Sequence, residues 1–432
     1  MNLIPKRIHA GALLLSVFVG TLIWILTAGL LLLIQYHNQY AERTLRYNRL
    51  DQNLASATNL FLTRDRAAAH GCDSNVTDLY LKGGDSVIIV SRPWGIYETG
   101  VITAFEQRDT VSSALLVGMV LSDTSVYALY LADEHTPLSL SGRAFIRGDV
   151  YLPPAGTRKS YIENEGYAYE EEIHSGVIHN STADIQPLDS LIIGRLSRYL
   201  HSDDSIGWRE MALDWFSLMS IDSLHHPFDS PPLTLSIAER YSIRSSIRGN
   251  IIIVADSAVT IGMDAVMEDV ILFAPSIRFE DGFRGTLQAF ARDSLIVGES
   301  CTFDYPSALG LVNIPDDSLE QEVQPLLQID SASVVAGMVF SHFPADEPDV
   351  ATVRIGKDAE IHGELYADGL LELRGTVQGI TRCRRFTLRT SSSLYDNFVL
   401  GGTMDVTRLS PYYAGSALLH MGRLKRVMKW LE

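Results

Sequence analysis

The chain has 432 residues, enough for two or three domains that each bury a core, so its stability need not depend on disulfide bonds. Its three cysteines, Cys72, Cys301 and Cys383, include no C-x-x-C pair, which argues against a disulfide framework and a zinc site. The formal charge is −17; residues 1–50 carry five basic side chains and one acidic, a balance of +4, which leaves −21 for residues 51–432. Phosphate backbones repel such an acidic body, so we expect no nucleic-acid partner.

Residues 10–34 carry no formal charge and are dominated by Leu, Ile, Val, Ala and Gly. A run of this length predicts a transmembrane helix over residues 10–35. A cleaved secretory signal has a shorter apolar core followed by a small-residue cleavage site, and Gln35-Tyr36-His37 is no such site. Lys6 and Arg7 place the tip, residues 1–9, in the cytoplasm. The expected location is therefore the bacterial inner membrane, crossed once, with the body periplasmic or extracellular.

The helical pattern continues beyond the membrane as a predicted stalk helix over residues 36–65. Its apolar positions recur close to every 3.5 residues and are separated by Arg, Asn, Asp and Gln. Such a seam packs either on a neighbouring chain or on the protein's own body, and the sequence leaves both open. The seam residues are Tyr40, Tyr47, Leu50, Leu54, Ala57 and Phe61.

A basic tip, the pair Ala10-Gly11 and a long apolar helix running into an amphipathic one together resemble the N-terminus of type IV pilins and pseudopilins, over about 55 residues. In those families a peptidase cuts after a small residue, and the exposed helix then packs into a filament. The resemblance implies a processing site at Ala10 or Gly11 and partners that are pilus or secretion subunits, or further copies of this chain. The sequence departs from the family at the fifth mature position, where Ser16 or Leu15 replaces the usual Glu.

Between residues 84 and 132 four apolar segments alternate with turn signals, which predicts a small antiparallel β meander within residues 66–136. Farther along, pairs of short strands recur at spacings of 17 to 19 residues. A unit so short cannot bury its own apolar face, so successive copies must stack. The first strands of the repeat are NIIIVAD, DVILFAP and TLQAFAR, beginning at 250, 269 and 286, and the second strands are AVTIG, SIRFE and SLIVG, beginning at 258, 276 and 294.

These repeats predict a mainly β fold whose body is a β-solenoid over residues 236–415, with its first coils at 137–188. Gly337, Gly363 and Gly375 centre a second series of strands and are expected where a Cβ would clash. Residues 189–235 contain apolar residues at helical spacing and are predicted to be a helical insertion. Residues 416–432 are predicted to be an amphipathic helix, because Leu424, Val427, Met428 and Leu431 lie at i, i+3, i+4 and i+7.

No catalytic motif, cofactor motif or metal-ligand spacing is present, so the sequence predicts no enzyme, no cofactor and no metal site. Asp256 and Asp293 are surface carboxylates at matching corners about 10 Å apart, a separation that an inverting glycosidase can use. Asp is also a preferred turn residue, and solvated turns are the favoured interpretation. The histidine groups are interpreted as surface residues: His174 and His179 near Glu170, Glu171 and Glu172, and His225 and His226 near Asp229.

The leading hypothesis from the sequence is a single-pass membrane-anchored structural protein with an extracytoplasmic β-solenoid, a minor pilin-like or pseudopilin-like component of a pilus or secretion apparatus. The bilayer, through residues 10–35, and the stalk helix are its expected contacts. Two alternatives stay open. One is a tethered carbohydrate-active solenoid enzyme. The other is a scaffold or glycan-binding module, since the strands between 334 and 379 are similar to the short coils of bactofilins.

Overall fold

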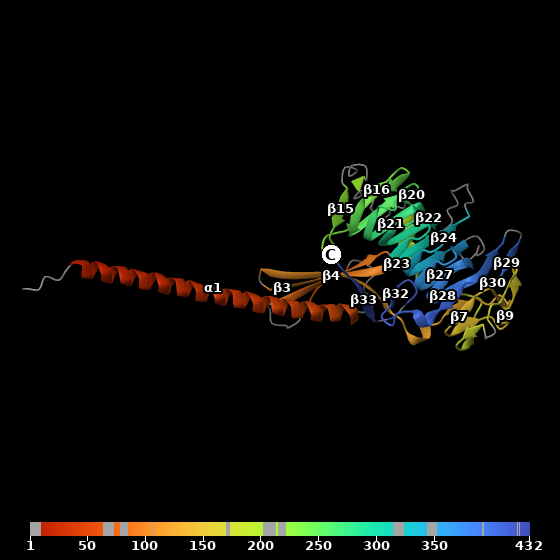
Figure 1. Ribbon diagram of the computed structural model, residues 1–432, viewed down its shortest axis with the longest axis horizontal. Coiled ribbons are helices and arrows are strands. Elements are labelled where there is room, and N and C mark those ends of the chain that lie inside the picture. The colour runs from red at the N-terminus through yellow and green to blue at the C-terminus, as the bar shows by residue number, and fades with distance from the viewer. Residues whose placement is uncertain are drawn as a thin grey trace, which may run out of the picture.

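The computed structural model describes residues 10–63, 73–77, 85–106, 108–169, 173–201, 213–214, 222–313, 324–343, 352–390, 393–420, 422 and 424–432. It is mainly β, with one long helix that projects from the body (Figure 1). The prediction of a mainly β chain with an N-terminal apolar helix is therefore confirmed.

Helix α1 runs without a break from Ala10 to Thr63, so the predicted membrane and stalk segments form one element. Its two halves differ in their surroundings. The side chains of the N-terminal half lie outside the body, whereas Leu50, Ala57 and Phe61 are buried against a β-sheet. Gly100 in that sheet makes room for the helix, because a Cβ there would lie 2.7 Å from Cζ of Phe61.

The sheet under α1 is antiparallel and six-stranded, as predicted for the meander but with different outer strands. Its order is β1-β2-β3-β4, and both β32 and β33 pair with β4. The predicted fourth meander strand, near residues 125–132, belongs elsewhere: β5 pairs in parallel with β28 and β8. The strands of the sheet are β1 (Asp73–Thr77), β2 (Asp85–Trp94), β3 (Tyr97–Glu106), β4 (Asp109–Val120), β32 (Ala414–Gly415) and β33 (Lys425–Leu431).

The C-terminal strand β33 is a correction, since residues 416–432 were expected to form an amphipathic helix. β33 pairs antiparallel with β4, and its register shifts between Val427 and Lys429, which makes Met428 an extra residue. Such a bulge moves the apolar phase of a strand by one position. Because of this shift, the apolar residues at 424, 427, 428 and 431 show helical spacing although the segment forms a strand.

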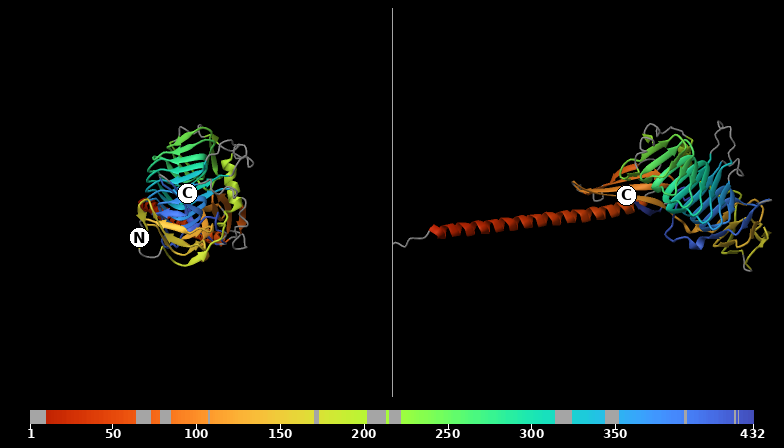
Figure 2. Two further views of the ribbon diagram at one scale, coloured as in Figure 1. Left: turned by 90° about the vertical axis from the view of Figure 1, so that its right-hand side faces the viewer. Right: turned by 45° about the horizontal axis from the view of Figure 1, so that its top comes forward.

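The rest of the body is a 22-stranded sheet that winds around one apolar core, named here the wound sheet (Figure 2). Its strands form three ladders of parallel pairs, and the long strands bend from one ladder into the next. The first ladder contains β15 (Ser223–His226), β18 (Ser246–Gly249), β21 (Val266–Phe279), β22 (Arg284–Val297), β23 (Thr302–Val312), β25 (Val334–His342), β27 (Glu360–Leu373), β28 (Thr376–Arg389), β31 (Thr403–Asp405), β7 (Phe145–Arg147) and β12 (His174–Ser175).

The second and third ladders share the long strands of the first. The second adds β14 (Leu213–Asp214), β16 (Leu233–Ile237), β19 (Ile251–Ala255), β5 (Leu129–Leu131), β8 (Val150–Leu152) and β13 (Ile178–Asn180), and the third adds β17 (Tyr241–Ile243), β20 (Val259–Ile261), β24 (Leu326–Ile329) and β26 (Thr352–Ile355). β29 (Leu394–Asp396) pairs antiparallel with β28. A three-stranded sheet holds β30 (Phe398–Leu400), β6 (Leu138–Ser141) and β9 (Thr157–Lys159), and a two-stranded sheet holds β10 (Tyr161–Ile162) and β11 (Glu165–Gly166).

The repeat predicted between 250 and 298 has the register that the structure shows. Ile253 pairs with Leu272, which pairs with Ala289, and all three lie in the core of the wound sheet. In the third ladder Val259 pairs with Ile277 and Ile277 with Leu295. Alternation therefore identified both the strands and their alignment.

The windings do not follow chain order. β5, which begins the wound sheet along the chain, pairs with the late strand β28, and β8 and β13 continue from β5. Residues 137–188, expected as the first coils, therefore stack beyond the last strands of 236–415 rather than before its first ones. From β13 the chain passes to α2 (Ser190–Leu200) and then to the opposite end of the ladders.

Helix α2 is capped by Asp189, whose carboxylate accepts from the backbone N–H groups of Leu191 and Ile192. It confirms only part of the predicted insertion at 189–235, since β14, β15 and the start of β16 are strands. Residues 202–212 and 215–221 of that segment lie outside the described residues. The buried side of α2 covers the outer face of the second ladder and, with the antiparallel sheet, encloses a second apolar core.

The three predicted glycines occupy close-packed positions. Gly337 and Gly363 pair in the ladder and have φ values of +137° and +145°, and a Cβ on either would meet a backbone carbonyl of the preceding winding. The next member of this column is Gly379, with φ +158°, and not Gly375 as its sequence series suggested. Gly375 is tight for another reason, because a Cβ there would meet the carbonyl of Ala359.

Candidate functional site

The first half of α1 carries a continuous run of exposed apolar side chains. Its most apolar 18-residue window has a mean hydropathy of 2.6 and no buried residue, so α1 is long and apolar enough to span a membrane. The Ser and Thr hydroxyls of residues 10–34 donate within the helix: Ser16 to the Leu13 carbonyl, Thr21 to the Phe18 carbonyl and Thr27 to the Trp24 carbonyl, each at 2.9 Å. This segment therefore offers hydrocarbon with its Ser and Thr hydroxyls satisfied.

Ala10 and Gly11, the predicted processing site, lie at the first residues of α1. A Cβ on Gly11 would meet nothing within 4 Å. Processing there stays a prediction. The charged tip, residues 1–9, lies outside the described residues.

Part of the stalk seam packs on the protein's own body. Leu50, Ala57 and Phe61 lie on the protein's own antiparallel sheet, so this part of the seam is internal. Tyr40 and Tyr47 remain 64% and 38% exposed. The seam thus divides near residue 50 into an outward part and a packed part.

Ion pairs hold the packed half of α1 at one end of the sheet, and a cation–π contact holds it at the other. Arg49 donates to Glu106 at 2.8 Å, and Arg46 lies 3.3 Å from Asp109, both beside the turn between β3 and β4. At the other end of this contact, Lys425 of β33 donates to Glu98 at 2.7 Å, and its Nζ lies 4.7 Å from the Phe61 ring centroid. The C-terminal strand therefore helps to hold α1 on the sheet.

A buried ionic cluster, named here the Glu364 cluster, joins the wound sheet to the C-terminal segment. Arg382 Nη1 lies 2.8 Å from the Glu364 carboxylate and His420 Nε2 also lies 2.8 Å from it, while Arg382 Nε donates to the hydroxyl of Tyr127 at 2.7 Å. Glu364 and Arg382 are fully buried. Burial would raise the pKa of Glu364, but the charges and hydrogen bonds of His420 and Arg382 lower it to about 2.

Sequence reasoning missed this cluster, although a signal was present. Glu364 and Arg382 are charged residues next to Leu365 and Cys383, which face the core of the wound sheet. Arg382 also continues an outward column in the second ladder, in which Phe340 pairs with Tyr366 and Tyr366 with Arg382. A buried charge of this kind indicates a partner from another part of the chain.

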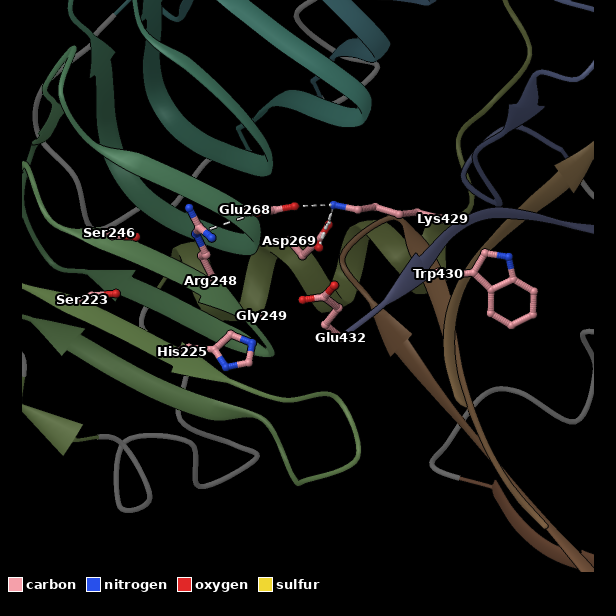
Figure 3. A pocket seen from close by; sticks show the side chains of 10 residues that line it. All are labelled: Ser223, His225, Ser246, Arg248, Gly249, Glu268, Asp269, Lys429, Trp430 and Glu432. Atoms are coloured by element: carbon pink, nitrogen blue, oxygen red, sulfur yellow. Dashed lines mark hydrogen bonds and ion pairs between the residues drawn. The ribbon is translucent and has the colours of Figure 1, made fainter. Parts of the chain in front are cut away.

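An open cavity of 610 Å³ lies where β33 approaches the first ladder (Figure 3). His225, Arg248 and Glu268 pair in successive windings and line one wall. Lys429 of β33 enters from the opposite wall and donates to Glu268 at 3.0 Å and to Asp269 at 2.8 Å. Burial would lower the pKa of Lys429, but its bonds with these two carboxylates raise it.

Four charged side chains in this cavity, Arg248, Glu268, Asp269 and Lys429, are engaged with one another. Arg248 lies 3.9 Å from the same Glu268 carboxylate that accepts from Lys429. Asp269 has a φ of +59° at a register irregularity of β21, which turns its side chain toward Lys429. The arrangement supports a polar joint between β33 and the wound sheet.

Asp256 and Asp293 are not drawn into either charged cluster. Asp256 is exposed at the end of β19. The Asp293 carboxylate accepts from its neighbour Arg292 through both oxygens, at 2.9 and 3.0 Å. The corner of the winding between Asp256 and Asp293 is occupied by Pro275, not by a third carboxylate. Their use in glycoside cleavage stays untested.

Among the described residues, no group of three or more His, Cys, Asp or Glu side chains is placed to hold a metal ion. His179 stacks on Tyr151 at 4.8 Å, and His226 Nε2 lies 2.8 Å from the Pro231 carbonyl. His174 is half-buried in β12, and His225 faces the cavity of Figure 3. Glu170, Glu171 and Glu172 lie outside the described residues.

Comparison of the chain with protein-family models, with curated proteins and with solved structures finds no match.

Proposed function

We propose that the protein is a single-pass, membrane-anchored structural or assembly protein of the bacterial inner membrane. Its N-terminus is cytoplasmic, and its acidic body lies in the periplasm or outside the cell. The observation that carries the proposal is the contrast along α1: the apolar half has no partner within the described chain, whereas the amphipathic half is packed and ion-paired. A bilayer supplies what the first half lacks.

The wound sheet is proposed to be a β-solenoid. Three features support this. Parallel pairs join residues about one winding apart along the chain, as in Ile253, Leu272 and Ala289. The side chains facing inward form one continuous core. The register irregularities of β21, at Glu268/Val270 and Ala274/Ser276, lie where this strand passes from one ladder to the next.

The anchor and the antiparallel sheet together support a pilin-like or pseudopilin-like role. A helix whose second half lies on an antiparallel sheet leaves its first half available to neighbours in the membrane or in a filament. Tyr40 and Tyr47 continue the seam from the packed residues toward that available half. In this proposal α1 contacts pilus or secretion subunits, or further copies of the chain, and the wound sheet is carried as a structural body.

Membrane fractionation followed by N-terminal sequencing tests the anchor and its processing separately. We expect the protein to resist alkaline carbonate extraction, and the body to be digested by protease added to spheroplasts. Release by carbonate, or protection of the body, would contradict the proposed topology. An intact Met1 would contradict pilin-like processing, whereas Gly11 or Ala12 as the first residue would support it.

Cysteine cross-linking in membranes tests assembly through α1. In a chain carrying Cys72→Ser, Tyr40→Cys is expected to give covalent adducts with a bismaleimide, because this side chain is 64% exposed. Leu54→Cys is the matched control, since it faces the protein's own sheet. The native Cys301 and Cys383 are buried and give little background. Equal yields at both positions would contradict an outward seam.

A further inference from the structure

A second cavity, of 530 Å³, lies at the junction of the antiparallel sheet, α2 and the outer face of the second ladder. Its volume is within the range of small-molecule sites, about 300–1,000 Å³. The end of β2 supplies Trp94, α2 supplies Tyr199, and β21 supplies Phe273. Three independent elements therefore enclose it, which distinguishes it from a groove along one element.

The inner surface of this cavity is apolar and rigid. Trp94, Ile271 and Phe273 are at most 3% exposed. Tyr199 stacks on Phe273 with ring centroids 4.7 Å apart, and Trp94 packs edge-on against Phe228 at 5.3 Å. These side chains form the packed base of the cavity. The apolar surface that a flat aromatic or aliphatic body would contact comes from Val90, Tyr199, Pro231 and Pro232, which are half-buried or exposed.

The charge of the lining is opposite to that of the whole chain. Arg92 and Arg195 line the cavity, and no carboxylate is among its described lining residues, although the chain carries a net charge of −17. Arg195 Nη2 donates to the Gly95 carbonyl at 2.9 Å and Arg92 Nη1 to the Ser230 carbonyl at 3.1 Å, which fixes both side chains at the cavity. Burial raises the pKa of Tyr199, so its phenol stays neutral there.

We propose that this cavity binds a small organic anion, an aromatic or aliphatic body that carries one carboxylate. The apolar walls would accept the body. The planar guanidinium groups of Arg92 and Arg195 match the geometry of a carboxylate better than an ammonium group would.

The ligand is a water-borne molecule and not a lipid of the anchoring bilayer. Strand β3 begins at Tyr97, close to Trp94 of the cavity, and ends at Glu106, which pairs with Arg49 of α1. Glu106 marks the membrane-proximal end of the sheet. Ten residues of strand span roughly 30 Å, so the cavity lies about that far from the membrane-proximal end.

Calorimetric titration of the full chain in nanodiscs, with empty nanodiscs subtracted, tests the proposal. The probes are 2-naphthoate and the uncharged 2-naphthylmethanol, which share the ring system. We expect saturable binding of naphthoate and at least tenfold weaker binding of the alcohol. Equal affinity for the two probes, or no saturable binding of naphthoate, would overturn the proposal.

Matched arginine variants locate the binding. Arg195→Gln is expected to weaken naphthoate binding at least tenfold, whereas Arg198→Gln, on the same helix but outside the cavity lining, should leave it unchanged. Arg92→Gln provides a second variant from a different element, in case Arg195→Gln loses native circular dichroism. A loss of the same size in Arg198→Gln, or no loss in a folded Arg92→Gln or Arg195→Gln, would place binding elsewhere and contradict the inference.

Discussion

Two clusters of charges join the C-terminal segment to the wound sheet, and they differ in burial. The Glu364 cluster is inaccessible to water, with side-chain exposures of 0%, 1% and 5% for Glu364, Arg382 and His420. The Lys429 cluster, which pairs Lys429 with Glu268 and Asp269, opens into the cavity of Figure 3, and Lys429 and Glu268 are 26% and 44% exposed. The same kinds of side chain therefore have different energetic consequences, because water replaces a lost partner in only one of the two places.

The largest expected effect comes from breaking the buried pair on one side. Arg382→Met leaves the Glu364 carboxylate buried without its permanently charged partner, and a loss of about 3–5 kcal/mol in the free energy of unfolding is expected. Urea unfolding of the detergent-solubilised chain, followed by tryptophan fluorescence, measures it.

The double variant Glu364→Leu with Arg382→Met is the control for this loss. Removing both charges avoids the uncompensated ion, so the double variant should recover part of the stability that Arg382→Met loses. If the double variant were as unstable as the single one, packing of the Arg382 side chain rather than its charge would explain the loss.

The pH dependence of the free energy of unfolding is expected to show the contribution of Glu364. The folded-state pKa of Glu364, about 2, lies below its ordinary value of 4.5, so its contribution is complete above pH 4.5 and is lost as the pH falls toward 2. Each unit corresponds to roughly 1.4 kcal/mol. Between pH 5 and pH 3 the wild type should therefore lose about 2 kcal/mol more than the double variant. Urea midpoints at pH 7, 5 and 3 measure the difference, and parallel losses in both proteins would contradict the assignment.

The sequence predicted well those features that depend on neighbours along the chain. The strands between 250 and 298, their register, α2 and the tight positions of Gly337 and Gly363 all follow from alternation, capping or backbone constraint within one or two windings. The antiparallel pairing of β2 to β4 follows in the same way from short turns.

Features that depend on distant partners were missed for physical reasons. The alternation of β5 is the same whether it pairs with β4 or with β28, so sequence could not place it. The bulge at Met428 disguised β33 as a helix. The Glu364 cluster joins Glu364 and Arg382, which are one winding apart, to Tyr127 and His420, which lie far from them along the chain and which no local pattern connects to them.

A third prediction concerns the aromatic column that leads to the Glu364 cluster. Gly310 lies between Phe290 and Phe340 in the second ladder. In Gly310→Ala the new Cβ would lie 2.8 Å from Cδ1 of Phe290 and 2.5 Å from Cε1 of Phe340, so overpacking should cost about 1–3 kcal/mol. Gly194→Ala is the matched control, because a Cβ there meets nothing within 4 Å and lies in α2. The midpoint temperature of thermal unfolding should fall in Gly310→Ala and rise slightly in Gly194→Ala.

The smallest effect is expected at the open cluster. In Lys429→Ala the carboxylates of Glu268 and Asp269 lose a partner. Glu268 is 44% exposed and water can solvate it, whereas Asp269 is 11% exposed and borders the cavity, so the loss should be about 1–2 kcal/mol, below that of Arg382→Met. The difference from wild type should shrink further in 1 M NaCl, where charges are screened over roughly 3 Å. Urea midpoints at 0.05 and 1 M NaCl measure both effects. A salt-insensitive loss as large as that of Arg382→Met would contradict this prediction. Solvent exposure would then not explain the difference in stability between the two clusters.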